Sequence, residues 1–485
     1  MKSLSNLRLP FWITPVSTAF VGSLLLTVIA HQGKVINLDG ILYVHTALEF
    51  LDSGFDAAMK TYRFPFFPIL MALVAKLTGL GPEYAGYLLN ALFMAGASAL
   101  LVSCVGRIGP ELVWPACLAV LSIPGINEYR HELLREYGCW FFVMLGLWLA
   151  LRWEENPRWM TALAAQASLA TAALFRLEAL AFFVALFFWQ VWQAQGADRA
   201  RRLLMIGGLP IIGGIVLLGL YFGGNISGGS KFAEDLRRFS LVSFDAKAQV
   251  LAASLIDFGK ANAGTILFVG SLAIVPLKII GKLDLFLIPL AFAILSGQFR
   301  SMSVRFALFG WGIAVCLLVL AVFAVDMQFV SGRYTGLLLW CSVPFVGFGL
   351  WQMMQRYPRW RILILLLAGL TMIANLKAFG PSSRYYVEAG TWLSSNVKDT
   401  SRVYNESARM LHYAGWYKTE IMQKNKRDLI GTVLAENRYD YFVLEASPRD
   451  PPIQPWLDKN GLKVLKRFDR SSGRGSVVVA VPAGN

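Results

Sequence analysis

The sequence predicts a polytopic, all-helical membrane protein of about 11–13 membrane-spanning helices, with juxtamembrane helices and a small C-terminal α/β soluble domain. The chain of 485 residues is 56% apolar and 15% charged, with a mean hydropathy of +0.54, which excludes an ordinary soluble protein. Its apolar residues recur in blocks of roughly 15 to 22, long enough to cross a bilayer as helices. After Lys377 the composition becomes that of a soluble domain.

The apolar blocks predict a series of transmembrane helices. Block 64–80 is shorter and carries two prolines near its start, so it predicts either a span or a partly embedded juxtamembrane helix. The interval 263–298 stays open, because the basic residues at its ends do not fit two complete spans; a broken or re-entrant helix is one interpretation. The predicted spans other than 64–80 are 11–30, 84–106, 111–125, 138–152, 159–175, 177–195, 203–222, 263–280, 283–298, 305–325, 333–352 and 361–378.

The basic residues of the membrane part indicate topology. The net charge is +15, but many of these residues lie in short loops between apolar blocks, which is typical of cytoplasmic loops and argues against nucleic-acid binding. We therefore expect the polar stretch after the first span to face the outside. The basic loop residues are Arg107, Arg152, Arg158, Arg199, Arg201, Arg202, Arg356, Arg359 and Arg361.

The sequence predicts two domains. Residues 1–378 form the membrane domain, with an external loop at 31–63 and a large external loop at 223–262 whose Gly/Ser-rich start indicates a flexible lid or substrate-entry element. Residues 379–485 form a periplasmic α/β domain large enough for its own core. Its predicted elements are helices near 383–396, 406–413, 427–437 and 453–460, and strands near 401–404, 440–446, 462–468 and 475–481.

The stretch 33–70 carries the strongest candidate residue. It follows the first apolar block and returns to polar chemistry at one membrane face. Apolar residues recur at helical spacing from Ile41 to Leu51 and predict an amphipathic helix along the interface. Asp39 opens this helix. It is either a helix N-cap or an acid/base residue beside an anionic lipid headgroup, and the two roles are compatible.

A second polar stretch covers residues 127–136. Glu132, Arg135 and Glu136 share one helix face directly before a span, so they predict either a solvated, self-paired helix start or a second carboxylate delivered to the cleft that Asp39 enters.

Further ionisable residues lie at the ends of apolar blocks. Arg176 and Glu178 stand between two such blocks, where charge is expensive and faces a cavity or a partner; a mutual pair or a helix-turn anchor is the alternative. Arg333 and Tyr334 open a later span, with interfacial snorkelling and an aromatic belt as their alternative. Arg63, Arg176 and Arg333 are the candidate ligands of a phosphate or pyrophosphate, because guanidinium binds such groups bidentately.

Other site types find little support. No phosphate-cradling P-loop occurs, and the cysteines all lie in or beside apolar segments, without a disulfide framework or metal-ligand spacing. The four histidines are too scattered along the chain to predict a metal site or a triad, so we expect structural or solvated roles for them. They are His31, His45, His131 and His412.

The order of these motifs resembles a known family. Asp39-Gly40 after the first span, the block FPFFPIL from Phe64, Glu136 ahead of Phe141-Phe142, Arg176-Leu-Glu178, Arg333-Tyr334 and a small closing polar domain follow one another. This layout resembles the polyprenyl-phosphate-sugar-dependent glycosyltransferases of the GT-C fold. The relevant branch includes protein O-mannosyltransferases and the lipid A aminoarabinose transferase.

The resemblance implies a function. It implies inverting transfer of a sugar from an undecaprenyl- or dolichyl-phosphate donor to a lipid, glycan or protein acceptor at the periplasmic side of the cell inner membrane. Asp39 then matches the catalytic acid, Glu136 the second acidic position, and Arg63 the position of a Lys that contacts the lipid phosphate. Glu132, Glu178 and Tyr334 complete the predicted substrate-binding set with Arg176 and Arg333.

Two departures and two alternatives accompany the resemblance. The first motif reads Asp-Gly where the family has Asp-Glu, and Phe64-Pro65 stands where Pro-Pro is usual, which weakens the match of Arg63. Some family members use a divalent metal; no ligand cluster is evident here, so the metal is left open. The alternative functions are a transporter or lipid-linked sugar flippase, and a scaffold whose C-terminal domain recruits partners.

Overall fold

The computed structural model describes residues 13–32, 34–196, 198–222, 241–376, 384–417, 434, 438–446, 452–470 and 475–483. The chain forms two compact units, and each is described by itself. Unit 1 comprises Met1–Val28, Leu89–Arg130 and Arg135–Leu376. Unit 2 comprises Ile29–Leu88, His131–Leu134 and Lys377–Asn485.

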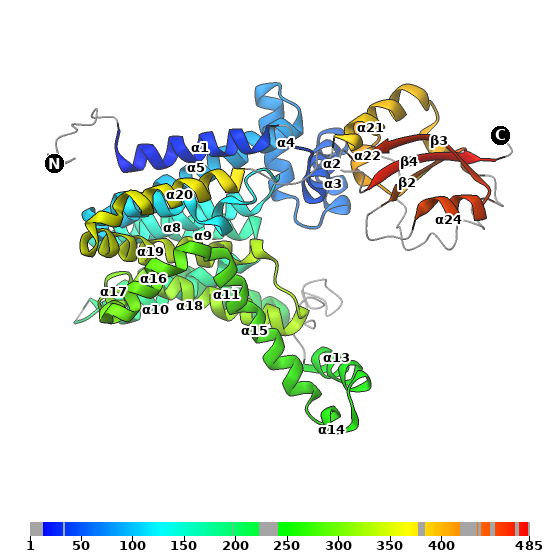
Figure 1. Ribbon diagram of the computed structural model, residues 1–485. Helices are drawn as coiled ribbons and strands as arrows, with labels where there is room; N and C mark the ends of the chain where they lie inside the picture. The colour runs from blue at the N-terminus through cyan, green and yellow to red at the C-terminus, as the bar shows by residue number, and fades with distance from the viewer. Residues whose placement is uncertain are drawn as a thin grey trace. The chain divides into compact units, whose positions relative to one another are not determined.

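Unit 1 is a helical bundle (Figure 1). Its first half contains α1 (Pro15–His31), α5 (Pro82–Ile108), η2 (Pro110–Leu112), α6 (Val113–Ser122), α7 (Pro124–Asn127), α8 (Glu136–Glu155), α9 (Trp159–Phe175), η3 (Leu177–Leu180), α10 (Ala181–Gln193) and α11 (Arg199–Phe222), where α1 and α5 each also extend into unit 2. Its second half contains α13 (Leu241–Ser254), α14 (Asp257–Lys260), α15 (Ala263–Leu283), η4 (Asp284–Phe286), α16 (Leu287–Ala293), η5 (Ile294–Gln298), α17 (Phe299–Arg305), α18 (Ala307–Met327), η6 (Gly332–Thr335), α19 (Gly336–Arg356), η7 (Pro358–Trp360) and α20 (Arg361–Leu376).

The predicted polytopic helical fold is confirmed. Among the described residues, five helical stretches are long and apolar enough to cross a membrane, and further apolar helices are shorter. The five are Pro82–Ile108, Ala263–Arg305, Ala307–Met327, Gly332–Arg356 and Pro358–Leu376. The chain is therefore a multi-pass membrane protein.

The interval 263–298 is resolved into one long helix and one broken one. α15 is continuous, but the predicted span 283–298 is not a single helix. A 3-10 turn precedes the seven-residue α16, and Gly297, with φ +73°, interrupts the helix before α17. Positive φ is available to glycine without strain, so the chain bends there while the following residues resume helical geometry.

The second part of the predicted loop 223–262 is helical in the structure. Residues 223–240 lie outside the described residues. Residues 241–262, expected to continue a flexible loop, instead form α13 and α14, which lie beside α15 (Figure 1). The Phe244 ring of α13 contacts the Phe268 ring of α15, with centroids 6.3 Å apart, and tertiary contact of this kind supplies much of a helix's stability in a folded protein.

Ion pairs lie at the two ends of the unit 1 bundle. At the end where α8 finishes, Arg107 lies 2.5 Å from Glu155, and Arg202 lies 2.7 Å from Glu154. Glu136 stands at the other end of the same helix. A helix of 20 residues is about 30 Å long, which matches the hydrocarbon core of a bilayer.

The polar stretch 127–136 also contains a residue that is wholly buried. Arg130 is 0% exposed and donates hydrogen bonds to the Ser23 carbonyl at 2.9 Å, to Thr27 Oγ1 at 2.6 Å and to Asn127 Oδ1 at 2.8 Å. These partners come from α1 and α7, so the guanidinium joins the first helix to the turn before α8.

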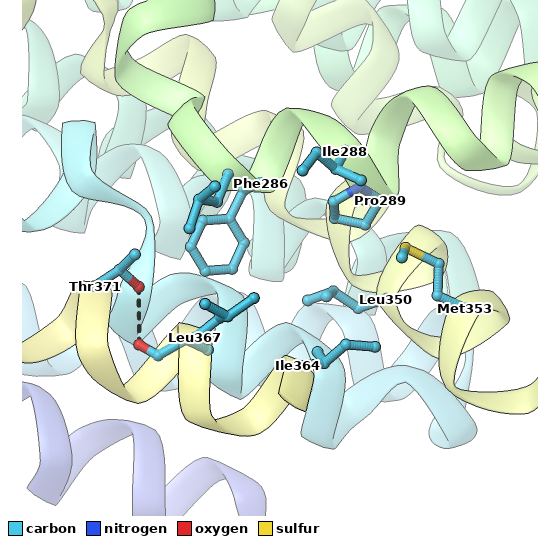
Figure 2. A pocket seen from close by; sticks show the side chains of 10 residues that line it. Phe286, Ile288, Pro289, Leu350, Met353, Ile364, Leu367 and Thr371 are labelled. Atoms are coloured by element: carbon cyan, nitrogen blue, oxygen red, sulfur yellow. Dashed lines mark hydrogen bonds between the residues drawn. The ribbon is translucent and has the colours of Figure 1, made fainter. Parts of the chain in front are cut away.

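An apolar cavity of about 90 Å³ lies between η4, α16, α19 and α20. Figure 2 shows Phe286 and Pro289 facing Leu350 and Leu367 across it. A larger apolar cavity of about 450 Å³ lies among α10, α16, α17, α18 and α19. None of the predicted site residues lines either cavity.

Unit 2 combines short helices with a mixed sheet. Its helices are α2 (Leu38–Ser53), α3 (Phe55–Thr61), α4 (Phe66–Thr78), the beginning of α5, α21 (Tyr385–Asn396), α22 (Ala408–Ala414) and α24 (Ile453–Lys459), with η8 at Thr400–Arg402. The strands are β1 (Val403–Asn405), β2 (Tyr441–Ala446), β3 (Leu462–Asp469) and β4 (Ser476–Pro482), in the order β1-β2-β4-β3. β1 and β2 are parallel, and the other pairs are antiparallel.

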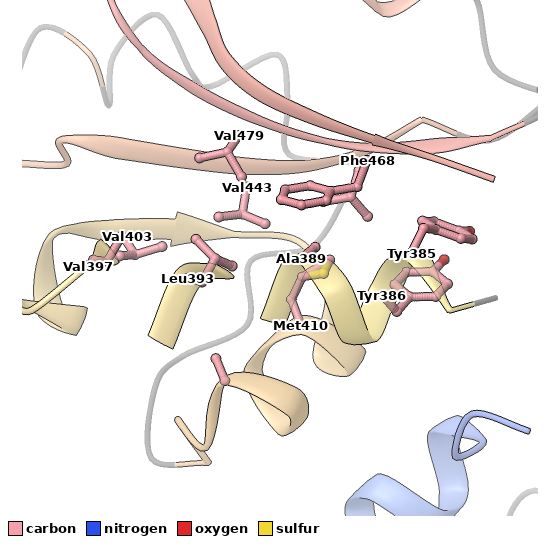
Figure 3. Close-up of a cluster of buried hydrophobic side chains, with 12 residues drawn as sticks. Tyr385, Tyr386, Ala389, Leu393, Val397, Val403, Met410, Val443, Phe468 and Val479 are labelled. Atoms are coloured by element: carbon pink, nitrogen blue, oxygen red, sulfur yellow. The ribbon is translucent and has the colours of Figure 1, made fainter. Parts of the chain in front are cut away.

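The α/β part of unit 2 has a core on each face of its sheet. On one face, Ala389 and Leu393 of α21 pack toward Val443, Phe468 and Val479 (Figure 3). On the other face, α24 covers a second cluster, which includes Ile453, Leu457, Phe442, Leu444 and Val478. The alternation of the strand residues places successive side chains on opposite faces, as the period of a β-strand requires. The predicted helix 427–437 lies almost entirely outside the described residues.

The shorter block 64–80 forms α4 within unit 2. This helix has 13 residues and a length of about 20 Å, which is shorter than the hydrocarbon core of a bilayer. The structure thus favours a juxtamembrane helix over a complete span.

Candidate active site

Four of the predicted site residues come together in unit 1. The Arg176 guanidinium donates to Glu136 Oε1 at 2.6 Å and to Glu178 Oε1 at 2.5 Å. The same guanidinium lies over the Tyr334 ring, 4.8 Å from its centroid. We name Glu136, Arg176, Glu178 and Tyr334 the arginine cluster.

Each member of the arginine cluster lies at the end of a helix. Glu136 is the first residue of α8, where the positive end of the helix dipole favours a carboxylate. Arg176 adopts an extended backbone directly after α9, and Glu178 follows on η3. Tyr334 lies on η6, and its ring also contacts Phe323 with a centroid separation of 5.0 Å. Three separate chain segments thus converge on one guanidinium.

Glu136 has two oxygen atoms in different surroundings. Its side chain is 5% exposed, and Oε1 is held by Arg176. Oε2 is buried and has no hydrogen-bond partner. Buried carboxylate oxygens in native proteins are nearly always hydrogen-bonded, so an unpaired one indicates a place for a donor such as a substrate hydroxyl. This oxygen is the feature of the arginine cluster best suited to acid/base chemistry or hydrogen bonding.

A second cation, Lys282, lies beside η6, and the sequence analysis did not identify it as a site residue. Lys282, at the end of α15, forms an ion pair with Glu128 and lies 5.3 Å from the centroid of the Tyr129 ring. A Cβ on Gly332 would lie 2.4 Å from Lys282 Cε and 2.5 Å from Tyr129 Oη. Because Gly332 has no side chain, Lys282 can lie beside η6. In the sequence, this glycine directly before Arg333 was the one signal of a close neighbour.

Arg333 lies on η6 between these two groups. Gly332 borders Lys282, and Tyr334 covers Arg176. Arg333 on η6 is thus flanked in sequence by Gly332, which lies beside Lys282, and by Tyr334, which lies beside Arg176. Three cations gather at this end of unit 1, and clusters of Arg and Lys are the usual ligands of phosphate.

Asp39, Arg63 and Glu132 belong to unit 2. Asp39 is half-buried in the first turn of α2, but the N-cap position is occupied by Asn37, so the N-cap interpretation of Asp39 is wrong. Arg63 lies between α3 and α4 with its guanidinium 5.7 Å from the Phe64 ring centroid. Glu132 lies 4.0 Å from the His131 ring nitrogen.

The residues around Asp39 explain why glycine follows it. Asn37 does not cap α2 with its side chain. Instead, the Leu133 N–H donates to Asn37 Oδ1 at 2.9 Å, and Asn37 Nδ2 donates to the Leu133 carbonyl at 3.3 Å. A Cβ on Gly40 would lie 2.9 Å from Leu133 Cβ and 2.7 Å from Asn37 Oδ1. The departure from Asp-Glu to Asp-Gly therefore has a steric cause, because the 131–134 segment packs directly on the helix start.

Two of the histidines, which are far apart in the sequence, meet in the structure. The rings of His45 and His412 are stacked with centroids 5.8 Å apart, and His412 Nε2 lies 2.9 Å from Glu83 Oε2. His31 contacts Tyr87 with ring centroids 4.1 Å apart. Among the described residues, no group of three or more His, Cys, Asp or Glu side chains has a metal-binding arrangement.

The stability of unit 2 is expected to fall as the pH drops from about 7 to 5. Burial, and next the neighbouring His412, lower the pKa of His45 to about 4, and its Nε2 is buried without a hydrogen-bond partner. The unfolded chain takes up this proton near pH 6.5, so below that value the unfolded state binds more protons, at a cost approaching roughly 1.4 kcal/mol per pH unit.

Melting temperatures of the wild type and His45→Gln between pH 7.5 and 5 measure this effect. The loss of stability on acidification should be smaller in His45→Gln, which has no titrating ring at this position. Equal losses in both proteins would show that His45 does not contribute.

Comparison with known proteins gives a likeness in fold. No family model and no curated protein sequence matches this chain. The crystal structure of ArnT from Cupriavidus metallidurans bound to undecaprenyl phosphate is similar over 96% of this chain and 97% of that chain, with a TM-score of 0.54 and 13% sequence identity. The apo structure of the same protein gives a TM-score of 0.41, with 14% identity and the same coverage. The first likeness shows that the chain has a GT-C-like fold.

Proposed function

We propose that this chain is an inverting glycosyltransferase that moves a sugar from a polyprenyl-phosphate donor of the undecaprenyl type to a lipid, glycan or protein acceptor. The observation that carries the proposal is the likeness in fold, over nearly the whole chain, to an ArnT structure that contains undecaprenyl phosphate. Within unit 1, Glu136 lies against Arg176 and Lys282 borders η6, and such groups are compatible with the chemistry of such a transfer.

Asp39 is the proposed general base. The acceptor hydroxyl attacks the anomeric carbon, and Asp39 takes up its proton. A bond forms between the acceptor oxygen and the anomeric carbon, while the bond from that carbon to the phosphate oxygen breaks and leaves its electron pair on the polyprenyl phosphate. Attack from the side opposite the leaving group inverts the anomeric configuration.

The cations are proposed to stabilise the leaving phosphate. Arg63 and Arg333 are the predicted ligands, and Lys282 adds a third positive group beside η6. Fixed cations stabilise developing negative charge more strongly where water is excluded. Arg176 already donates to two carboxylates, so we assign it the positioning of Glu136, whose second oxygen is available to a donor or acceptor hydroxyl.

The charge distribution supports an active side at the outer face of the inner membrane. The arginine cluster and Lys282 lie at one end of unit 1, and Arg107 and Arg202 lie at the other. Basic loop residues favour the cytoplasmic side, so we propose the periplasmic side for the arginine cluster.

A transporter or lipid-linked sugar flippase is the alternative, and the broken stretch from η4 to α17 is the observation that favours it. Broken helices often form the ion and substrate sites of transporters. The residues 287–298 across this break contain no charged side chain, however; their polar side chains are Ser296, whose hydroxyl donates to the Phe292 carbonyl, and Gln298.

A donor panel in proteoliposomes tests the proposal. Purified wild-type protein is supplied with radiolabelled polyprenyl-phosphate sugars and with candidate lipid, glycan and peptide acceptors. Sugar covalently attached to an acceptor, with the opposite anomeric configuration, supports the proposal. Movement of a labelled donor across the bilayer without transfer would instead support the flippase.

A further inference from the structure

The C-terminal α/β domain contacts the segment that leads into α2. The backbone N–H of Ile36 donates to Tyr413 Oη at 3.0 Å, and Arg409 Nε donates to the Ile36 carbonyl at 3.4 Å. Arg409 and Tyr413 are four residues apart on α22, so they project from one face of that helix. Both backbone groups of a fully buried residue are thus satisfied by side chains of the C-terminal domain.

The contact extends along α2. His45, near its middle, stacks on His412 of α22, and at its far end the Tyr417 hydroxyl donates to Asp52. His412 also bonds Glu83 at the beginning of α5. The C-terminal domain therefore holds the beginning, the middle and the end of α2, and every partner lies within unit 2.

The two side chains at Ile36 are themselves fixed. The Arg409 guanidinium lies over the Tyr386 ring of α21, 5.1 Å from its centroid. A Cβ on Gly390 would lie 2.5 Å from Tyr413 Cβ, so α21 and α22 pack too closely there for any side chain larger than glycine. α21 belongs to the core of the C-terminal domain, which leaves Arg409 and Tyr413 little freedom.

The residues before Asp39 are consequently held from two directions. Tyr413 and Arg409 bind Ile36, and the 131–134 segment binds Asn37 through the backbone of Leu133. Asp39 follows two residues later. A catalytic group has to be held within about 0.5 Å of its productive position, and supporting hydrogen bonds supply that precision.

We propose that Tyr413 and Arg409 are positioning residues, through which the C-terminal domain fixes the start of α2 and with it Asp39. This role rests on the proposed function, in which Asp39 is the base. It assigns the C-terminal domain a part in the transfer step itself, whichever acceptor is used.

Tyr413→Phe in the full-length protein is the direct test. The change removes one hydroxyl and keeps the ring, so the domain should fold. We expect hydrogen exchange at the Ile36 amide to rise about fivefold, because a lost hydrogen bond costs about 1 kcal/mol locally. In proteoliposomes, kcat should fall about tenfold while the KM for the donor stays within about twofold, since misplacement of the base affects the reacting geometry.

Tyr441→Phe is the matched control, because Tyr441 lies on β2 against the core of the same domain. It should change neither the exchange at Ile36 nor kcat. At Arg409, Arg409→Met should repeat the loss of kcat, and Arg409→Lys, which keeps a donor, should recover part of it.

The outcomes separate the positioning role from the proposed function. Faster exchange with unchanged kcat, or unchanged exchange, in Tyr413→Phe overturns the positioning role while the proposed function stands. A wild type that transfers no sugar from any donor overturns both. Lower kcat with faster exchange and a steady KM supports both.

Discussion

Replacement of Asp39 by Asn is expected to lower sugar transfer by about 10²–10⁴-fold while donor binding is retained. Asn has nearly the same size and shape as Asp, so it fits the same position in the first turn of α2. It accepts no proton at neutral pH, so the acceptor hydroxyl would keep its proton during attack. Transfer rates and donor binding in proteoliposomes measure the two effects separately.

Asp56→Asn provides the control for charge. Asp56 lies in the first turn of α3, in the same unit, and is exposed. This variant removes one carboxylate from the same predicted external loop, residues 31–63. It should transfer sugar at the wild-type rate. Undiminished transfer in correctly folded Asp39→Asn would show that another group is the base, and Glu136 would be the next candidate.

Replacement of Arg176 by Met is expected to destabilise unit 1 by about 3–5 kcal/mol and to abolish most transfer. The side chain of Arg176 is 13% exposed and is the hydrogen-bond partner of Glu136 and of Glu178. Its removal leaves a buried carboxylate without a compensating charge, which costs far more than the pair itself contributes. Thermal unfolding in detergent and transfer in proteoliposomes are the two measurements.

Arg107→Met is the matched control at the other end of α8. The ion pair of Arg107 with Glu155 is more exposed, at 29% and 55% for the two side chains, so its loss should cost no more than about 1 kcal/mol. If both variants lose the same stability, the arginine cluster has no special role in holding unit 1 together. A double variant that combines Arg176→Met with Glu136→Gln should regain part of the lost stability but not the transfer.

Hydropathy predicted most of the membrane helices because each apolar block is long enough to identify by itself. The predicted span 159–175 coincides with α9, and α20 (Arg361–Leu376) covers the described part of the predicted span 361–378. The interval 283–298 was ambiguous for a physical reason. A helix broken at Gly297 has the same composition as an unbroken one, and only the backbone angles distinguish them.

The candidate site was predictable in its residues and not in its contacts. Arg176 and Glu178 stand out in the sequence because charges are rare between apolar blocks. Their mutual pairing was one of the alternatives considered, and the structure has this pair. The link from Arg176 to Glu136, 40 positions earlier, depends on the packing of α8 against α9. Lys282 and the stacked His45 and His412 lie even further from their partners along the chain, so local spacing gave no signal for them.

The spacing of charged groups along α8 has a consequence for the surrounding lipid. Glu136 and Glu155, each held by an arginine, mark the two ends of a helix of about 30 Å. Acyl chains that are much longer would draw one ion pair into hydrocarbon, and shorter chains would leave apolar side chains in the headgroups. Such hydrophobic mismatch costs fractions of a kcal/mol per Å, so this bundle favours membranes of ordinary thickness.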